Sequence, residues 1–240
     1  PVAVQPRSAV IIGGGPAGLM AAEVLALGGV QVDLFDGMPS VGRKFLLAGV
    51  GGMNITHAET QENFLERYAQ RRQQLEPMLR AFGAQQLREW VHALGIDTFV
   101  GSSGRVFPAD MKAAPLLRAW LKRLRELGAR IHTRQRWLGW NSDGSLRING
   151  PAGEQAVHAD ALLLALGGGS WARLGSDGAW LPLLQDRDIQ LQALQPSNCG
   201  FEVTGWSQHF AGKFAGAPVK SCAMVANSAS PPRIRSIVAL

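Results

Sequence analysis

Residues 8–18 of this 240-residue chain read Ser-Ala-Val-Ile-Ile-Gly-Gly-Gly-Pro-Ala-Gly, and they are the strongest indication of its fold class. Its first five residues form a short apolar run that is typical of a strand buried in a parallel sheet. The next six residues satisfy the spacing G-x-G-x-x-G. Pro16 falls where a helix should begin, a position at which its missing N–H costs nothing. The stretch therefore predicts a strand, a tight glycine turn and a helix.

Three glycines of this turn have properties that a bound dinucleotide requires. Gly13 allows the tight turn, Gly15 lets a pyrophosphate approach the backbone, and Gly18 lets the helix pack closely on the strand. A second strand pattern over residues 30–36 ends in Asp36, whose carboxylate can accept hydrogen bonds from a ribose diol. Elements in this order predict a dinucleotide-binding α/β domain with a doubly wound parallel sheet. NAD and FAD remain alternatives here, because they share the adenosine diphosphate half.

Two further glycine-rich segments are candidates for ligand contact. An apolar strand pattern over residues 160–166 runs directly into three glycines, residues 167–169. Ligands of doubly wound sheets lie at the carboxyl ends of strands, so this segment predicts a second contact with the dinucleotide. Residues 42–57 contain four glycines, and we expect them to form a loop against the ligand, with Arg43 and Lys44 near the pyrophosphate. The alternative is a solvated glycine loop with incidental cations.

The rest of the chain predicts further helices and strands. Helical patterns cover residues 61–94 and 112–127, and residues 101–108 are expected to form a loop. Strands are expected over residues 130–140 and 145–149, on either side of an Asn-Ser-Asp-Gly turn.

These patterns divide the chain into two predicted domains. Residues 1–195 form the dinucleotide-binding domain, with a helical excursion over about 60–127. Beyond residue 195 the sequence changes to short segments interrupted by Gly, Ser and Pro. We therefore expect residues 196–240 to be the beginning of a smaller, β-rich inserted domain.

Composition excludes several classes of protein. The 46% apolar and 18% charged residues exclude an intrinsically disordered chain and a membrane bundle. Cys199 and Cys222 form no CxxC pair, which argues against a disulfide scaffold and suits a reducing compartment. No apolar stretch reaches the ~20 residues of a transmembrane helix, so the sequence predicts a cytoplasmic protein without membrane contact.

Chemical motifs of other enzyme classes are absent from the sequence. It contains no HExxH, G-x-S-x-G or G-x-x-x-x-G-K-[ST] pattern, which excludes zinc-peptidase, hydrolase and P-loop functions. No cysteine pair occurs in residues 42–57, so a flavoenzyme of this sequence would transfer hydride through the flavin alone. His57 lies in this segment, and we favour a hydrogen-bonded loop histidine over a proton-transfer group. The sequence predicts no metal ligands, and it identifies no catalytic residue.

Four motifs together resemble the HI0933-like, or BaiN-like, family of bacterial NAD(P)/FAD-dependent oxidoreductases. They are GGGPAGLMAA (13–22), GRKFLLAGVGGMNITH (42–57), GRVFP (104–108) and LALGGGSWARLGSDGAW (164–180). PSNCGF (196–201) and AGAPVKSC (215–222) are similar to the inserted domain of that family. The resemblance implies a Rossmann-like FAD-binding domain and an oxidoreductase that acts on a small molecule, with NADH or NADPH as electron donor. The cofactor-binding residues that it implies are Gly13, Gly14, Gly15, Ala17, Gly18, Asp36, Arg43, Lys44, Gly52, Asn54 and Gly167.

The sequence also departs from that family. Many relatives have Ser, Arg, Cys and Asn where this chain has Ala48, Gly52, Met53 and His57, which suggests a distinct branch. The chain of relatives returns after the inserted domain and completes the flavin site, whereas this sequence ends at Leu240. From this departure we expect weak FAD retention and little turnover, as in a truncated chain with low activity.

An RNA-associated flavoprotein is a second hypothesis. It depends on an excess of 24 Lys and Arg over 18 Asp and Glu, a net charge of +6. Most of the basic residues concerned alternate with a leucine stripe, so a solvated helix face is the simpler explanation, and we do not favour nucleic acid as a partner. These residues are Arg105, Lys112, Arg118, Lys122, Arg123, Arg125, Arg130, Arg134 and Arg136.

Overall fold

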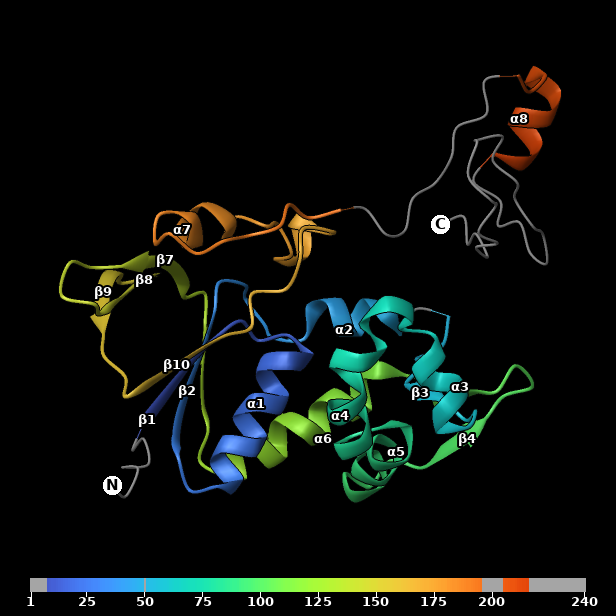
Figure 1. Ribbon diagram of the computed structural model, residues 1–240, viewed down its shortest axis with the longest axis horizontal. Coiled ribbons are helices and arrows are strands. Elements are labelled where there is room, and N and C mark those ends of the chain that lie inside the picture. Colours follow the sequence, from blue (N-terminus) through green and yellow to red (C-terminus); the bar gives the residue numbers. More distant parts are fainter. Residues whose placement is uncertain (1–7, 50, 196–204, 216–240) are drawn as a thin grey trace. The chain divides into compact units, whose positions relative to one another are not determined.

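The structure is a computed structural model that describes residues 8–49, 51–195 and 205–215 (Figure 1). The chain divides into two compact units, Pro1–Leu191 and Gln192–Leu240. The domain boundary after residue 195 stays a prediction. The described part of the second unit contains α8 (Gln208–Phe214), a helix that begins at the capping residue Ser207. The remainder of the β-rich domain predicted for residues 196–240 lies outside the described residues.

A four-stranded parallel sheet forms the centre of the first unit. Its strands are β1 (Ser8–Ile12), β2 (Gln31–Asp36), β6 (Arg130–Thr133) and β10 (Ala161–Leu164). They lie in the order β10-β1-β2-β6. If these four strands are numbered 1 to 4 along the chain, their order across the sheet is 4-1-2-3, which is part of the Rossmann strand order. The predicted α/β fold class is therefore confirmed.

Two different layers cover the two faces of this sheet. The covering elements are α1 (Pro16–Leu27) and α6 (Ala113–Glu126) on one face, and β7 (Arg136–Trp140), β8 (Leu146–Gly150), β9 (Gly153–Val157) and α7 (Leu181–Gln185) on the other (Figure 1). Successive residues of a strand point to opposite faces, so Ile11 packs under α1 while Val10 and Ile12 pack against Trp137. An antiparallel sheet and the short helix α7 thus cover the second face.

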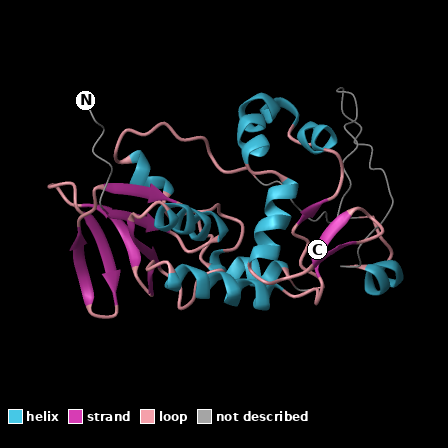
Figure 2. Cartoon of the chain, turned by 90° about the horizontal axis from the view of Figure 1, so that it is seen from below, coloured by secondary structure: helices cyan, strands magenta, loops and turns pink. Residues whose placement is uncertain are grey.

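The segment between β2 and β6 forms the predicted helical excursion. It contains α2 (Arg43–Ala48), β3 (Thr56–His57), α3 (Gln61–Glu66), the 3-10 helix η1 (Ala69–Arg71), α4 (Arg72–Ala81), α5 (Ala84–Ala93), β4 (Thr98–Val100), β5 (Arg105–Pro108) and α6. The short strands make a separate antiparallel sheet of order β3-β5-β4. Both views place this small sheet far from the central sheet, with helices between them (Figure 2).

Two sequence expectations are wrong in this region. Residues 42–57 were expected to be a loop, yet α2 forms because five of the six residues between Gly42 and Gly49 are good helix formers, and these glycines cap the helix instead of interrupting it. Residues 101–108 were also expected to be a loop, but β5 pairs with β4. Exposed and buried residues alternate in β5, as is typical of a strand. The pattern is difficult to recognise in the sequence because it is only four residues long and ends in a proline.

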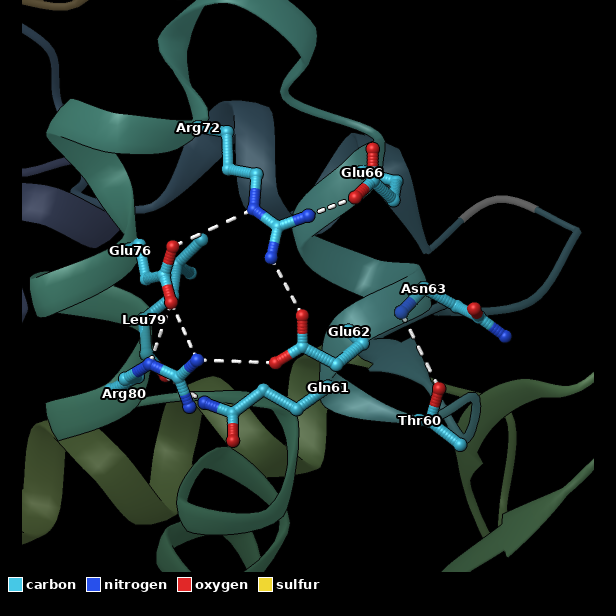
Figure 3. Close-up of polar contacts among 9 residues, drawn as sticks. All are labelled: Thr60, Gln61, Glu62, Asn63, Glu66, Arg72, Glu76, Leu79 and Arg80. Atoms are coloured by element: carbon cyan, nitrogen blue, oxygen red, sulfur yellow. Dashed lines mark hydrogen bonds and ion pairs between the residues drawn. The ribbon is translucent and has the colours of Figure 1, made fainter.

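Ion pairs join α3 to α4 on the surface of the excursion (Figure 3). Arg80 donates to Glu62 at 3.1 Å, and Arg72 donates to the other oxygen of Glu62 at 2.6 Å. Arg72 also pairs with Glu66, and both arginines pair with Glu76. The hydrogen bond from Arg80 holds the pKa of Glu76 below its usual value. The carboxylate of Glu62 thus bridges the two guanidinium groups.

Candidate functional site

A cleft opens at the carboxyl ends of β1, β2 and β10, where the chain crosses from one side of β1 to the other. Its volume is about 480 Å³. Clefts at such a switch point are where open α/β sheets bind their ligands. The lining residues come from four segments of the chain, within 12–16, 35–44, 135–138 and 165–183.

The glycine turn forms one wall of the cleft, and its glycines have different roles. Gly13 has a φ of +108°, and a Cβ there would lie 2.3 Å from the carbonyl oxygen of Ala165. A Cβ on Gly18 would lie 1.9 Å from the carbonyl oxygen of Gly13, so only glycine lets α1 approach β1 this closely. A Cβ on Gly15 would meet no atom within 4 Å. The fold thus requires two of these glycines, and the third leaves open space in front of α1.

Gly15 is also the N-cap residue of α1, with no side-chain group to bond the first amides. Pro16 follows as the first helical residue. Because the first N–H groups of a helix lack partners within it, they can donate to an anion. This wall therefore has the geometry of a phosphate-binding turn.

Asp36 ends β2 and lies beside the turn. Its Oδ2 accepts a hydrogen bond from the N–H of Gly14 at 2.6 Å, and its Oδ1 accepts one from the N–H of Met38 at 2.7 Å. Since each carboxylate oxygen has two lone pairs, both can still accept a hydroxyl from a ligand. Asp36 thus has a structural role that the sequence did not indicate, and its ribose contact stays a prediction.

Basic side chains line the cleft beside the turn. Arg43 and Lys44 lie in the first turn of α2, and Lys44 Nζ donates to Ser170 Oγ at 2.5 Å. Ser170 follows the predicted glycine segment after β10, so this hydrogen bond links two of the glycine-rich segments. The lining therefore carries positive charge where the sequence placed a pyrophosphate.

An ion pair between Arg136 and Asp177, 2.9 Å long, also lines the cleft. Burial alone would raise the pKa of Asp177, but the N–H of Ala179 and the Arg136 guanidinium outweigh it and lower that pKa. With Asp36, Arg43 and Lys44, the lining thus holds three cations and two carboxylates. This balance favours an anionic ligand.

Buried polar atoms without partners are concentrated in the cleft. Among the described residues, five buried side-chain nitrogen or oxygen atoms have no hydrogen-bond partner. Four of them belong to cleft residues: Arg43 Nε, Trp137 Nε1, Ser176 Oγ and Trp180 Nε1. Buried polar groups are normally paired, since an unpaired one costs free energy. The cleft therefore fits a ligand rich in polar atoms, as a dinucleotide is.

The structure brings most of the predicted binding residues together. Those that line the cleft are Gly13, Gly14, Gly15, Asp36, Arg43, Lys44 and Gly167. Ala17 is exposed on α1, and Gly18 is buried against β1. Gly52 lies against Met111, and Asn54 is exposed in the segment between α2 and β3. These last four do not line the cleft, and their contact with a cofactor stays a prediction.

Sequence reasoning did not identify the wall formed by Trp137, Ser176 and Trp180. Trp137 lies in a predicted strand, where an aromatic residue is typical of a core. The other two lie within the quoted motif 164–180, but their side chains carry no pattern that indicates ligand contact.

His57 lies outside the cleft, and both of its ring nitrogens have partners. Nδ1 accepts from the N–H of Glu59 at 3.2 Å, and Nε2 lies 3.0 Å from the carbonyl oxygen of Ser103. The interpretation of a hydrogen-bonded histidine is confirmed, but His57 lies in the short strand β3 and not in a loop. Within the part of the chain that the structure describes, no three His, Cys, Asp or Glu side chains gather as a metal site requires.

The basic residues behind the RNA hypothesis do not form a free patch. Four of the nine have acidic partners, in the pairs Lys122–Glu126, Arg123–Glu23, Arg130–Asp33 and Arg136–Asp177. Arg118 and Arg125 are exposed on α6, on the side away from the buried Leu117 and Leu124. Nothing in the structure supports nucleic-acid binding over a solvated helix face.

None of the described helices combines the length and apolarity needed to cross a bilayer.

Comparisons with known proteins agree with this fold. A 3-dehydro-bile acid delta(4,6)-reductase of Clostridium scindens is 29% identical over 192 residues, which cover 78% of this chain and 45% of that protein. The chain thus spans about half the length of this curated relative.

Two solved structures share the fold at lower identity. THI4 of Thermovibrio ammonificans has a TM-score of 0.50 at 19% identity, over 77% of this chain and 64% of that one. A 3-ketosteroid-delta4-(5alpha)-dehydrogenase of Rhodococcus jostii RHA1 has a TM-score of 0.52 at 15% identity, over 70% of this chain and 47% of that one.

The sequence model of one protein family, the HI0933-like protein Rossmann domain, matches residues 7–217. With its parallel sheet, glycine turn and terminal acid, the chain belongs to the HI0933-like Rossmann domain family.

Proposed function

We propose that the protein is a flavin-dependent oxidoreductase that binds FAD in the cleft. The observation that carries this proposal is the placement of the open Gly15, the carboxylate of Asp36 and four unpaired polar atoms around one space. A dinucleotide offers phosphate oxygens to the amides of α1 and ribose hydroxyls to Asp36. Membership of the HI0933-like family and the reductase relative support a redox function.

The roles of the lining residues follow from their charges. The first amides of α1, with Arg43 and Lys44, would hold the pyrophosphate and balance its charge. The negative charge of Asp36 favours a free ribose diol and repels a 2′-phosphate. When bound, FAD would accept and pass on a hydride, with NADH or NADPH as the proposed electron donor. The substrate is proposed to be a small molecule, since the relative is by name a reductase of a 3-dehydro-bile acid.

Further parts of the proposal rest on the sequence. Residues 1–195 would form the FAD-binding domain, and residues 196–240 would begin the smaller one. A cytoplasmic location is supported by the two cysteines, which form no CxxC pair.

The proposal is tested by titrating the purified 240-residue chain with FAD and following the flavin absorbance and the heat of binding. We expect one FAD per chain. Absence of binding at millimolar FAD would overturn the proposal. A second assay measures NADH and NADPH oxidation with FAD present, and it tests the donor separately from the cofactor.

A further inference from the structure

The segment between β10 and α7 forms one side of the cleft, and we call its residues 167–178 the cleft loop. Both of its ends are glycines in the left-handed region, since Gly167 and Gly178 each have a φ of +69°. Glycine passes between the left-handed and right-handed regions at little cost. The two ends of the cleft loop therefore have the backbone freedom that a pair of hinges requires.

Between these ends the cleft loop is closed on itself. The N–H of Trp171 donates to the carbonyl oxygen of Ser176 at 3.0 Å, and the N–H of Ser176 donates back to that of Trp171 at 3.1 Å. The 3-10 helix η2 (Ala172–Leu174) lies between the two residues. Among the described residues, the backbone of the cleft loop has no hydrogen bond to the rest of the unit except at its end, where Gly178 accepts from Leu181 of α7. The loop can thus move as one body without breaking backbone hydrogen bonds elsewhere.

Two uncharged or singly charged contacts hold the cleft loop to the residues that follow β2. Lys44 Nζ donates to Ser170 Oγ at 2.5 Å. Gly175 packs so closely on Met38 that a Cβ there would lie 2.8 Å from Met38 Cγ. Both contacts depend on side chains of the cleft lining, so the loop reaches from β10 to the segment 35–44 on side-chain contacts alone.

The third contact is the ion pair between Arg136 on β7 and Asp177 in the cleft loop. Arg136 donates to Asp177 Oδ2 at 2.9 Å, and the N–H of Ala179 donates to Oδ1 at 3.1 Å and orients the carboxylate. The two side chains are 57% and 30% exposed. An ion pair as exposed as this is weak and is screened by salt, so it can break and form again readily.

We propose that the cleft loop is a lid that opens about Gly167 and Gly178, and that the Arg136–Asp177 ion pair is its latch. A dinucleotide in the cleft lies against this loop, so its entry and its release both require the latch to break. The inference rests on the proposed function for the identity of the ligand. Because the latch closes the lid with and without a ligand, weakening it should raise the association and dissociation rates together and leave the Kd nearly unchanged.

The test is stopped-flow measurement of FAD binding and release by flavin fluorescence, with the wild type, Asp177→Asn, Arg136→Gln and the double variant. We expect both rate constants to rise about threefold in each single variant, with a Kd within about twofold of the wild type. The double variant should be no faster than the single ones, because all three break one contact. The matched control is Glu154→Gln, which breaks an exposed pair with Arg147 outside the cleft and should equal the wild type.

The two rates distinguish a latch from a simple effect of charge. If Asp177 only repelled an anionic ligand, Asp177→Asn would speed association and slow dissociation. If Arg136 only attracted that ligand, Arg136→Gln would slow association and speed dissociation. Either pattern, or rates that equal those of the wild type, would overturn the lid.

A second measurement tests the lid without any ligand. Arg173 is exposed within η2, and trypsin cleavage after it should be about threefold faster in Asp177→Asn and Arg136→Gln than in the wild type, because cleavage follows the population of the open loop. Peptide mapping by mass spectrometry gives the rate at this bond. Equal cleavage rates would overturn the lid. A wild type that binds no FAD would overturn the proposed function, and the cleavage rates would then still decide for or against the lid.

Discussion

Asp36 Oδ2 accepts a hydrogen bond from the N–H of Gly14 at 2.6 Å, so the acid that ends β2 holds the glycine turn that follows β1. The two residues are 22 positions apart, and the N–H of Gly13 adds a hydrogen bond to the carbonyl oxygen of Phe35 at 2.8 Å. The residue expected to bind a ribose therefore also shapes the turn expected to bind the pyrophosphate. Losses of stability and of affinity should consequently be coupled at this position.

Substitution of Asp36 tests this coupling. Asp36→Ala removes two charge-assisted hydrogen bonds of roughly 1.5–3 kcal/mol each, and we expect both a lower Tm and weaker FAD binding. Asp36→Asn keeps one carbonyl acceptor and should lie between Ala and the wild type in both respects. Tm is measured by differential scanning calorimetry and Kd by titration. An unchanged Tm in Asp36→Ala would show that the contact with Gly14 does not support the turn.

Gly15 and Gly18 form a matched pair that separates binding from folding. A Cβ on Gly15 would point into open space, and the φ of this residue is −79°, so Gly15→Val should fold with nearly native Tm while its side chain fills the pyrophosphate space. We expect at least a hundredfold loss of FAD affinity. Gly18→Val should instead lower the Tm strongly, because its Cβ would meet the oxygen of Gly13 at 1.9 Å. Native FAD affinity in Gly15→Val would mean that the turn binds no phosphate.

The parts of the site that the sequence predicts are the local ones. The glycine turn and Asp36 belong to one strand-helix-strand unit, whose spacing is visible within thirty residues. Trp137 and Trp180 join them only through the strand order β10-β1-β2-β6, which brings segments more than a hundred residues apart to one edge. Indole side chains in strands also resemble core residues, so their unpaired N–H groups become visible only in the structure.

The excursion shows a second reason for incorrect expectations. Glycines at 42 and 49 suggested a loop, although glycine is also the residue that favours the ends of helices.

The burial of Glu23 could not be predicted from the sequence. A single acidic residue on an apolar helix gave no sign of burial, yet Glu23 is 3% exposed. Its partners come from α5 and α6, whose packing against α1 depends on the tertiary fold.

Glu23 should be a major contributor to the stability of the first unit. Its carboxylate accepts from Trp120 Nε1 at 2.6 Å, from Arg123 at 3.0 Å and from Trp90 Nε1 at 3.1 Å. Glu23→Ala leaves two indoles unpaired and removes the acidic partner of the half-buried Arg123 guanidinium, which keeps its hydrogen bond to the carbonyl oxygen of Ala93. We expect a loss of about 3 kcal/mol in the free energy of unfolding. The control is Glu126→Ala, which breaks an exposed pair with Lys122 and should cost less than about 0.5 kcal/mol. Urea unfolding measures both, and equal losses would refute the buried cluster.

The acid dependence of stability should include a contribution from Asp33, which lies between Arg130 and His132 across the β2–β6 pair. Burial alone would raise the pKa of Asp33, but hydrogen bonds and charges from Arg130 and His132 lower it below 3.8. A carboxylate with a lowered pKa in the folded state stabilises the fold above its unfolded pKa, and this stabilisation is lost as the pH falls through the folded pKa. Asp33→Asn should therefore be less stable than the wild type at pH 7, and the difference should shrink between about pH 4 and about pH 2.

The measurement is the free energy of unfolding in urea at several pH values for both proteins. Glu154→Gln, on the exposed β8–β9 hairpin, is the control for a general effect of removing one negative charge. A difference between wild type and Asp33→Asn that stays constant from pH 7 to pH 2 would show that the protonation of Asp33 is not linked to folding.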